Sequence, residues 1–323
     1  MSSADSALTV MDIADVPTTP QAHLTTGDRI FRGASVAAAS VSLIIVAGTL
    51  IFLIDKARPA LSSAGTVKFF TTSVWNPGAG HFGVAGLLLG TVIIATVAMS
   101  IGVPLGVSMA LFINEYAPDS MRRPLTTMVD LLAALPSLLF GMWALFALQG
   151  HLAPVARFLS DHLSVLPFFT TSDEKLGYSS FVAGVVVGIM ILPIITSVTR
   201  DVMAQVPREQ CEGALALGGT RWGMIRQVIL PFSRSGIIGA SLLGFGRALG
   251  ETIAVALLIA PVVRLNSHIL TQGASSVAAY VAIHFGEASD LERSALIAAG
   301  LALFLLTFVV NLFARAIVSR SAS

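Results

Sequence analysis

The sequence predicts an all-α, polytopic membrane protein with six transmembrane helices. Of its 323 residues, 55% are hydrophobic and only 11% are charged, whereas soluble domains carry about 25% charged residues. The mean hydropathy is +0.84. Six long apolar runs each reach the roughly 20 residues that a membrane-spanning helix needs. The predicted surroundings are therefore membrane lipid, and the net charge of +1 does not indicate a nucleic-acid partner.

The apolar runs and the segments at the two ends set the predicted domain organisation. The runs cover residues 33–54, 84–113, 126–149, 179–199, 236–263 and 294–314. The first 28 residues contain four Asp and neither Lys nor Arg, and a polar segment of this kind is predicted to be a disordered cytoplasmic tail. Residues 29–318 then form one transmembrane domain with a cytoplasmic loop at 200–234, and residues 319–323 form the cytoplasmic end.

The distribution of basic residues predicts the orientation in the membrane. With the N-terminus inside, eleven arginines fall on the cytoplasmic side and seven basic residues fall on the outer side. Loops rich in Lys and Arg remain in the cytoplasm. We therefore expect a multi-pass protein of the cytoplasmic (inner) membrane with both termini in the cytoplasm.

Two charged residues interrupt the fifth apolar run. Arg247 and Glu251 are four residues apart, so on a continuous helix they lie on one face, one turn apart. A charge near the bilayer centre costs about 2.5–3.5 kcal/mol even on the lenient insertion scale. The spacing predicts an ion pair, which serves either a substrate pathway or a permanent salt bridge that fixes helix packing. Gly246 and Gly250 flank Arg247 and could leave room for a solute.

The loop between the fourth and fifth runs contains the sharpest sequence pattern. It includes Glu212-Gly-Ala, then Gly218, then Val-Ile-Leu-Pro231. Pro207 suits the first turn of a helix, and the pair Gly218–Gly219 is expected to end it. A second short helix is predicted to run as far as Leu230–Pro231. Such a helix–turn–helix is suited to docking, and the alternative is a plain polar connector.

This loop resembles the EAA motif of ABC-importer permeases, which reads E-A-A, three residues, G, nine residues, I-x-L-P. Every interval matches, and the departures are Gly213 for Ala and Val228 for Ile. The resemblance implies the permease fold of the type I ABC importers. It also implies that the 207–231 loop contacts a cytoplasmic ATPase, with Glu212, Gly218 and Pro231 as coupling residues.

Three further stretches resemble the PstC-type permeases of phosphate importers. They are Trp75-Asn-Pro followed by Phe82-Gly, Leu132-Ala-Ala-Leu-Pro-Ser137, and Leu243-Gly-Phe-Gly-Arg-Ala-Leu-Gly-Glu-Thr252. The resemblance implies transport of inorganic phosphate with Arg247, Glu251 and Thr252 on the substrate pathway. It implies a heterodimer with a PstA-type permease, a PstB-type ATPase dimer and a PstS-type phosphate-binding protein. A PstA-type subunit, or a permease for molybdate or sulfate, is the alternative.

The chemistry of the residues agrees with this resemblance. Phosphate is an anion, and the planar fork of donors on an arginine suits tetrahedral oxyanions. The sequence has no phosphate-binding loop of the G-x-x-x-x-G-K type, because none of its three lysines follows a glycine. We therefore expect no enzyme activity and no cofactor in this chain, with ATP used by the partner ATPase. The six histidines show no metal-ligand spacing. An ion-coupled secondary transporter and a membrane-embedded enzyme are the competing classes.

Overall fold

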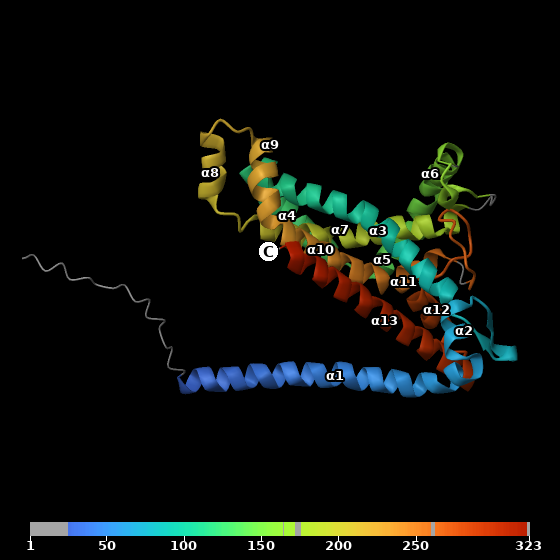
Figure 1. Cartoon of the computed structure of the whole chain (residues 1–323). Coiled ribbons are helices and arrows are strands. Elements are labelled where there is room, and N and C mark those ends of the chain that lie inside the picture. Colours follow the sequence, from blue (N-terminus) through green and yellow to red (C-terminus); the bar gives the residue numbers. More distant parts are fainter. Residues whose placement is uncertain (1–24, 164, 172–175, 260–261, 322–323) are drawn as a thin grey trace, which may run out of the picture. The chain divides into compact units, whose positions relative to one another are not determined.

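The computed structural model describes residues 25–163, 165–171, 176–259 and 262–321. These residues are helical almost throughout (Figure 1). The chain divides into two compact units between Thr49 and Leu50. The described part of the first unit is the N-terminal portion of one long helix, α1 (Thr26–Ala64). The remaining elements belong to the second unit.

Among the described residues, six helices are long and apolar enough to span a membrane, as the sequence predicts: Thr26–Ala64, Ala85–Tyr116, Ser137–His162, Ser180–Met203, Arg221–Leu249 and Asp290–Phe313. Their elements are α1, α3 (Ala85–Leu111), η2 (Phe112–Tyr116), α5 (Ser137–Trp143), η3 (Ala144–Leu148), α6 (Gln149–His162), α7 (Ser180–Met203), α9 (Arg221–Met224), η6 (Ile225–Ile229), α10 (Leu230–Leu249) and α13 (Asp290–Ser321). The shorter elements are α2 (Thr66–Thr71), β1 (Trp75–Asn76), η1 (Pro77–Ala79), β2 (His81–Phe82), α4 (Asp119–Ala134), η4 (Pro167–Phe169), η5 (Leu176–Tyr178), α8 (Arg208–Ala216), α11 (Ile253–Leu258) and α12 (Val277–His284).

The main core of the second unit is the contact between α3 and α7, with α10 packed against α7. Glycines allow the close approach of α3 and α7. A Cβ atom built on Gly184 would lie 2.6 Å from the Val97 side chain, and one on Gly102 would lie 2.8 Å from Ile191. In contrast, a Cβ atom on Gly246 would meet nothing within 4 Å. The glycines of α3 and α7 thus serve packing, whereas Gly246 faces open space.

The third predicted span, residues 126–149, is wrong in its bounds. The chain breaks at Leu135–Pro136, where Leu135 is extended (φ −66°, ψ 135°), and the long helix runs from Ser137 to His162 instead. A residue before proline is disfavoured in the helical conformation, so the proline ends α4 rather than kinking it. The segment before the break, α4, is a separate helix packed on α7.

The fifth predicted span, residues 236–263, is also displaced. The continuous helix begins at Arg221 and ends at Leu249, and the shorter α11 starts at Ile253. Gly250 lowers the helix propensity at this point. A side chain distant in the sequence satisfies one of the backbone groups freed at this break. The Ser276 hydroxyl donates a hydrogen bond to the Glu251 carbonyl oxygen at 3.4 Å. The fifth span is therefore a broken helix.

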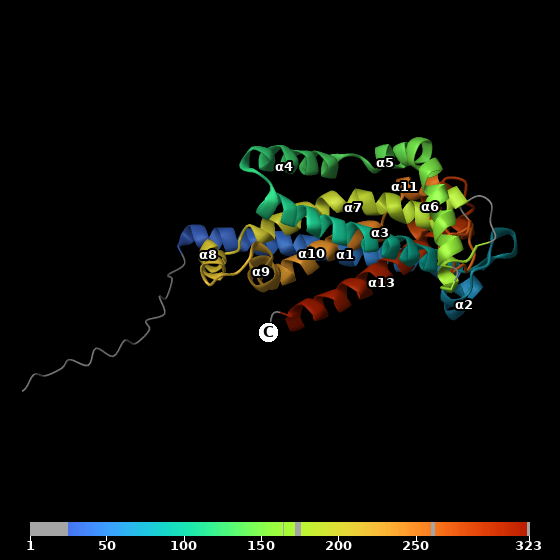
Figure 2. The same cartoon turned by 90° about the horizontal axis from the view of Figure 1, so that it is seen from above.

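The second unit has two distinct ends. The short helices α8 and α9 lie at one end together with the C-terminal end of α13 (Figures 1 and 2). The opposite end has α2, α12 and the β1–β2 hairpin. The Trp75 ring on this hairpin packs edge-on against Phe82 and Tyr280, with centroids 5.2 Å apart in each pair. Burial, with a smaller effect of Glu292, raises the pKa of Tyr280 to about 12, so this ring stays uncharged.

The predicted segments at the two ends of the chain fall partly outside the described residues. Residues 1–24 of the predicted 1–28 tail lie outside the described residues. Within the described part, α1 already begins at Thr26. Residues 322–323 of the predicted 319–323 cytoplasmic end also lie outside the described residues. The last helix continues to Ser321, past the boundary at residue 318.

Candidate functional site

The first candidate region is the 207–231 loop, where α8 begins after Pro207 as predicted. Its end is a Schellman motif, in which the Gly219 N–H donates to the Ala214 carbonyl at 3.2 Å and the Gly218 N–H donates to Leu215 at 3.0 Å. Gly218 has a φ of +85°, a conformation that glycine adopts without strain. The prediction that Gly218 ends this helix is confirmed.

The second helix of the loop does not stop at Pro231, and here the prediction is wrong. Thr220 caps α9 by accepting a hydrogen bond from the Gly223 N–H at 3.1 Å. The helix then passes through the π-helical turn Ile225–Ile229 into α10 without interruption. Proline cannot donate a backbone hydrogen bond inside a helix, and the wide π-helical turn Ile225–Ile229, where the regular α-helical pattern is interrupted, directly precedes the Leu230–Pro231 pair. The loop is therefore rigidly joined to the fifth span.

One side of this loop presents apolar side chains to the surroundings. Leu217 is 91% exposed and Trp222 is 59% exposed. Glu212 and Gly218 are exposed as well. Exposed apolar residues next to charged ones are typical of a protein interaction surface. We define Glu212, Leu217, Gly218 and Trp222 as the docking surface.

The inner side of α8 faces the bundle. Cys211 packs near a buried cluster that includes Met203, Met224 and Ile225. A cavity of about 570 Å³ lies between α8 and the helix ends. The Arg221 guanidinium donates to the Glu115 backbone oxygen at 3.4 Å. The loop is thus held against η2.

Cys211 offers a probe of this inner side. Desolvation raises the pKa of the Cys211 thiol, and the carboxylates of Glu115 and Glu212 raise it further. The thiolate is the reactive form, so we expect a maleimide to label Cys211 more slowly than free cysteine at neutral pH. The variant Glu212→Gln should speed labelling, because it removes one negative charge and lowers the pKa. Glu209→Gln, in the same helix, is the control, and an equal acceleration by both variants would contradict this electrostatic environment.

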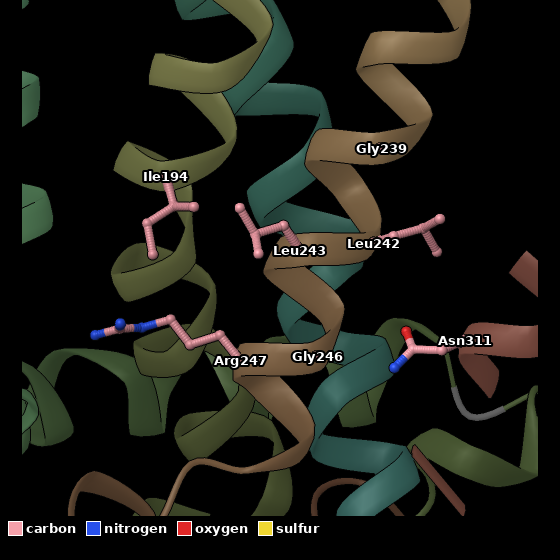
Figure 3. A pocket seen from close by; sticks show the side chains of 7 residues that line it. All are labelled: Ile194, Gly239, Leu242, Leu243, Gly246, Arg247 and Asn311. Carbon is pink, nitrogen blue, oxygen red and sulfur yellow. The ribbon is translucent and has the colours of Figure 1, made fainter. Parts of the chain in front are cut away.

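The second candidate region surrounds Arg247 on α10. A hollow of about 550 Å³ is lined by Ile194, Gly239, Leu242, Leu243, Gly246, Arg247 and Asn311. Figure 3 shows the Arg247 side chain extending from α10 on the side of Ile194, with Asn311 of α13 on the opposite side of α10. Arg247 is exposed. Within the described residues, its guanidinium group makes no ion pair or hydrogen bond. Arg247 is thus an unpaired cation on a membrane-spanning helix.

The predicted ion pair between Arg247 and Glu251 is wrong for the described structure. The helix ends at Leu249, so the two residues do not share a helical face. Glu251 is buried, with 7% of its surface exposed. Its Oε1 atom accepts a hydrogen bond from the Ala254 N–H at 3.4 Å, at the start of α11. The four-residue spacing implied a pair only on the assumption of a continuous helix.

Of the three predicted pathway residues, the structure brings only Arg247 to the hollow. Thr252 precedes α11 and its hydroxyl donates to the Gly250 carbonyl at 3.0 Å, so this donor is already used by the backbone. The sequence interpretation missed Asn311, a polar lining residue. Its signal was available, because Asn311 is the only amide in the apolar run 294–314.

The chain is similar in sequence to known transport permeases. The family described as binding-protein-dependent transport system inner membrane component matches residues 102–323. The phosphate transport system permease protein PstC 2 of Mycobacterium tuberculosis is 42% identical over 297 residues, covering 90% of this chain and 91% of the relative. The phosphate transport system permease protein PstC of Xylella fastidiosa is 40% identical over 296 residues, covering 91% of each chain.

Solved structures share the fold at lower identity. The crystal structure of a bacterial alginate ABC transporter, in complex with alginate pentasaccharide-bound periplasmic protein, matches with a TM-score of 0.63 and 18% identity. This match covers 91% of the present chain and 95% of the solved one. The fold is that of an ABC-importer permease. The family match and the relatives together show that this chain belongs to the binding-protein-dependent transport system inner membrane components and groups with their PstC permeases.

Proposed function

We propose that this chain is the membrane permease subunit of an importer that carries inorganic phosphate, driven by ATP that a separate ATPase hydrolyses. The observation that carries this proposal is the unpaired Arg247 beside a hollow on a spanning helix, in a chain whose relatives are named phosphate transport permeases. An intramembrane charge is a functional hypothesis by default. An arginine without a protein carboxylate is available to an anion.

The proposed partners follow from the two regions. A PstB-type ATPase dimer binds the docking surface at α8, and a PstA-type permease completes a heterodimer. A PstS-type binding protein delivers phosphate at the opposite end of the second unit. The alginate ABC transporter, solved with a periplasmic protein, supports this arrangement at the level of fold. This chain holds no cofactor of its own, and ATP is bound by the ATPase.

The proposed orientation places the docking surface and both termini in the cytoplasm. It is supported by the position of the C-terminal end of α13, which lies at the same end of the second unit as α8 and α9 (Figures 1 and 2). The arginines Arg208, Arg221 and Arg226 are also near this end, in keeping with the preference of basic loops for the cytoplasm.

Single-cysteine labelling tests this orientation. In a Cys211→Ser background, Leu217→Cys should react with a membrane-impermeant maleimide only after the cells are opened, because Leu217 is 91% exposed on the proposed cytoplasmic side. Ala79→Cys, in the hairpin turn at the other end, should react in intact cells. Labelling of residue 217 from outside intact cells would reverse the topology.

The transport proposal is tested by reconstitution. The permease pair, ATPase and binding protein are placed in vesicles that contain ATP inside, and uptake of radiolabelled phosphate is measured. We expect uptake that requires ATP and that excess sulfate or molybdate does not suppress. Uptake by this chain without the ATPase would instead indicate a secondary transporter, and suppression by molybdate or sulfate would reassign the substrate.

A further inference from the structure

A charged cluster on α7 lies apart from both regions described above. The Arg200 side chain is only 13% exposed. Its Nη2 atom donates to Asp201 Oδ1 at 2.9 Å and its Nε atom donates to the same oxygen at 3.1 Å. Ser197 is 3.4 Å from Nη2. Asp130, on the neighbouring α4, lies 3.7 Å from Arg200 Nη1.

The Arg200 backbone makes a further contact with another segment. Its carbonyl oxygen accepts a hydrogen bond from the Asn114 side chain in η2 at 2.9 Å. The next residue in η2, Glu115, is the one whose backbone accepts from Arg221 of the docking loop. Arg200 therefore joins α4, α7 and η2, and η2 in turn contacts the loop that carries the docking surface.

Few apolar contacts fix α4 in place. Val129 is its buried residue, at 1% exposure, whereas Met128 and Leu131 are more than half exposed. Beyond the break at Pro136, α5 packs tightly on α11, where a Cβ atom on Gly141 would lie 2.9 Å from the Ala254 backbone. Two polar contacts to Asp130 add to this limited apolar attachment of α4 to α7: Arg200 Nη1 lies 3.7 Å away, and the Ser197 hydroxyl donates a hydrogen bond at 3.3 Å.

The contact between Arg200 and Asp130 is too long to be a hydrogen bond. Arg200 Nη1 is buried and has no hydrogen-bond partner among the described residues. The 3.7 Å separation from Asp130 Oδ1 exceeds the roughly 2.8 Å of a charge-assisted hydrogen bond. A displacement of α4 by about 1 Å would make or break this bond. A small motion of α4 would therefore change this contact.

We propose that Arg200 is a positioning residue whose contact with Asp130 forms and breaks during transport. Through this contact, motion of the docking loop is passed to α4 and α5, and from there to the break between α10 and α11 beside Arg247. This inference rests on the proposed function. The side chain acts on substrate only through the helices that it joins. Mechanical coupling of this kind needs an element with two arrangements that both sites bias, and in this proposal the Arg200–Asp130 contact is that element.

The test compares variants in the complete reconstituted complex. Asp130→Asn removes the charge facing Nη1 while Asp201 still holds the Arg200 side chain. We expect Asp130→Asn to lower the stimulation of ATP hydrolysis by phosphate-loaded binding protein about 5-fold or more, a typical size for coupling between sites. Co-purification of the ATPase should be unchanged. Arg200→Gln should also lower the stimulation, and Arg200→Lys, which keeps the charge but lacks the fork of donors, should retain only part of it.

Asp290→Asn is the matched control, because the Arg293–Asp290 pair has a similar separation of 3.8 Å at the other end of the second unit. It should leave the stimulation unchanged. The positioning role would be overturned if Asp130→Asn showed full stimulation of ATP hydrolysis. It would also be overturned if the variant lost co-purification of the ATPase to the same degree as it lost the stimulation. If the wild-type complex itself shows no stimulation by phosphate, the proposed function fails, which is a different result from a failure confined to the variants.

Discussion

Replacing Arg247 by glutamine is expected to abolish phosphate uptake while the complex still assembles. Glutamine keeps hydrogen-bond donors but loses the charge, and removing one partner of a desolvated charge contact costs about 2 kcal/mol or more, roughly 30-fold in affinity. The exposed guanidinium makes no contact with a protein carboxylate in the described residues, so the fold does not depend on it. Uptake of radiolabelled phosphate and co-purification of the ATPase are the two measurements.

Two further variants sharpen this expectation. Arg247→Lys should be partly active at best, because an ammonium group lacks the planar fork of donors. The double variant Arg247→Gln/Glu251→Gln should not recover transport, since Glu251 caps α11 through the Ala254 N–H instead of neutralising Arg247. Recovery of transport in the double variant would show that the two charges compensate each other and form a salt bridge that only fixes helix packing.

The other large effect is expected from Gly218→Val in the docking loop. Gly218 has a φ of +85°, and a residue with a Cβ atom in this region costs about 1–2 kcal/mol, more for a β-branched side chain. No heavy atom lies within 4 Å of a Cβ atom built on Gly218, so the effect is one of backbone strain. The end of α8 should rearrange and ATP-driven uptake should fall by roughly tenfold or more. Uptake is measured in the reconstituted complex.

The control for Gly218→Val is a second glycine of the same loop. Gly213 also has open space around it but lies within α8, where alanine is favoured over glycine by up to about 1 kcal/mol. Gly213→Ala should therefore leave uptake intact. Glu212→Arg, which reverses an exposed charge on the docking surface, should impair uptake as Gly218→Val does. If Gly218→Val and Glu212→Arg both showed normal phosphate-stimulated ATP hydrolysis, the claim that this loop docks on the ATPase would be contradicted.

Local sequence patterns predicted the end of α8 correctly but not the continuation of the next helix. Gly218–Gly219 is a strong local signal, because only glycine readily takes the left-handed conformation that ends a helix. Pro231 was a misleading signal. Proline often kinks or ends a helix, but here the helix continues through Pro231, and the π-helical turn at Ile225–Ile229 that precedes it has no recognisable sequence pattern.

The candidate site shows the same division between local and tertiary determinants. Arg247 was identified because a charge in an apolar run is visible in the sequence. The separation of Glu251 from it was not visible, because the backbone after the helix end is held partly by tertiary contacts, such as the hydrogen bond from the Ser276 hydroxyl to the carbonyl of Glu251, 25 residues earlier. Asn311 reaches the hollow only because α13 packs beside α10. Such neighbours depend on tertiary packing, which residue spacing does not encode.

One measurement tests the central claim that Arg247 and the docking loop serve a single transport cycle. Phosphate uptake and ATP hydrolysis by the reconstituted complex are followed together, with and without phosphate-loaded binding protein, in wild type and in Arg247→Gln. We predict that phosphate stimulates hydrolysis in the wild type, and that Arg247→Gln retains the bound ATPase but loses phosphate uptake. Normal phosphate uptake by an assembled Arg247→Gln complex, with hydrolysis still stimulated, would contradict the claim.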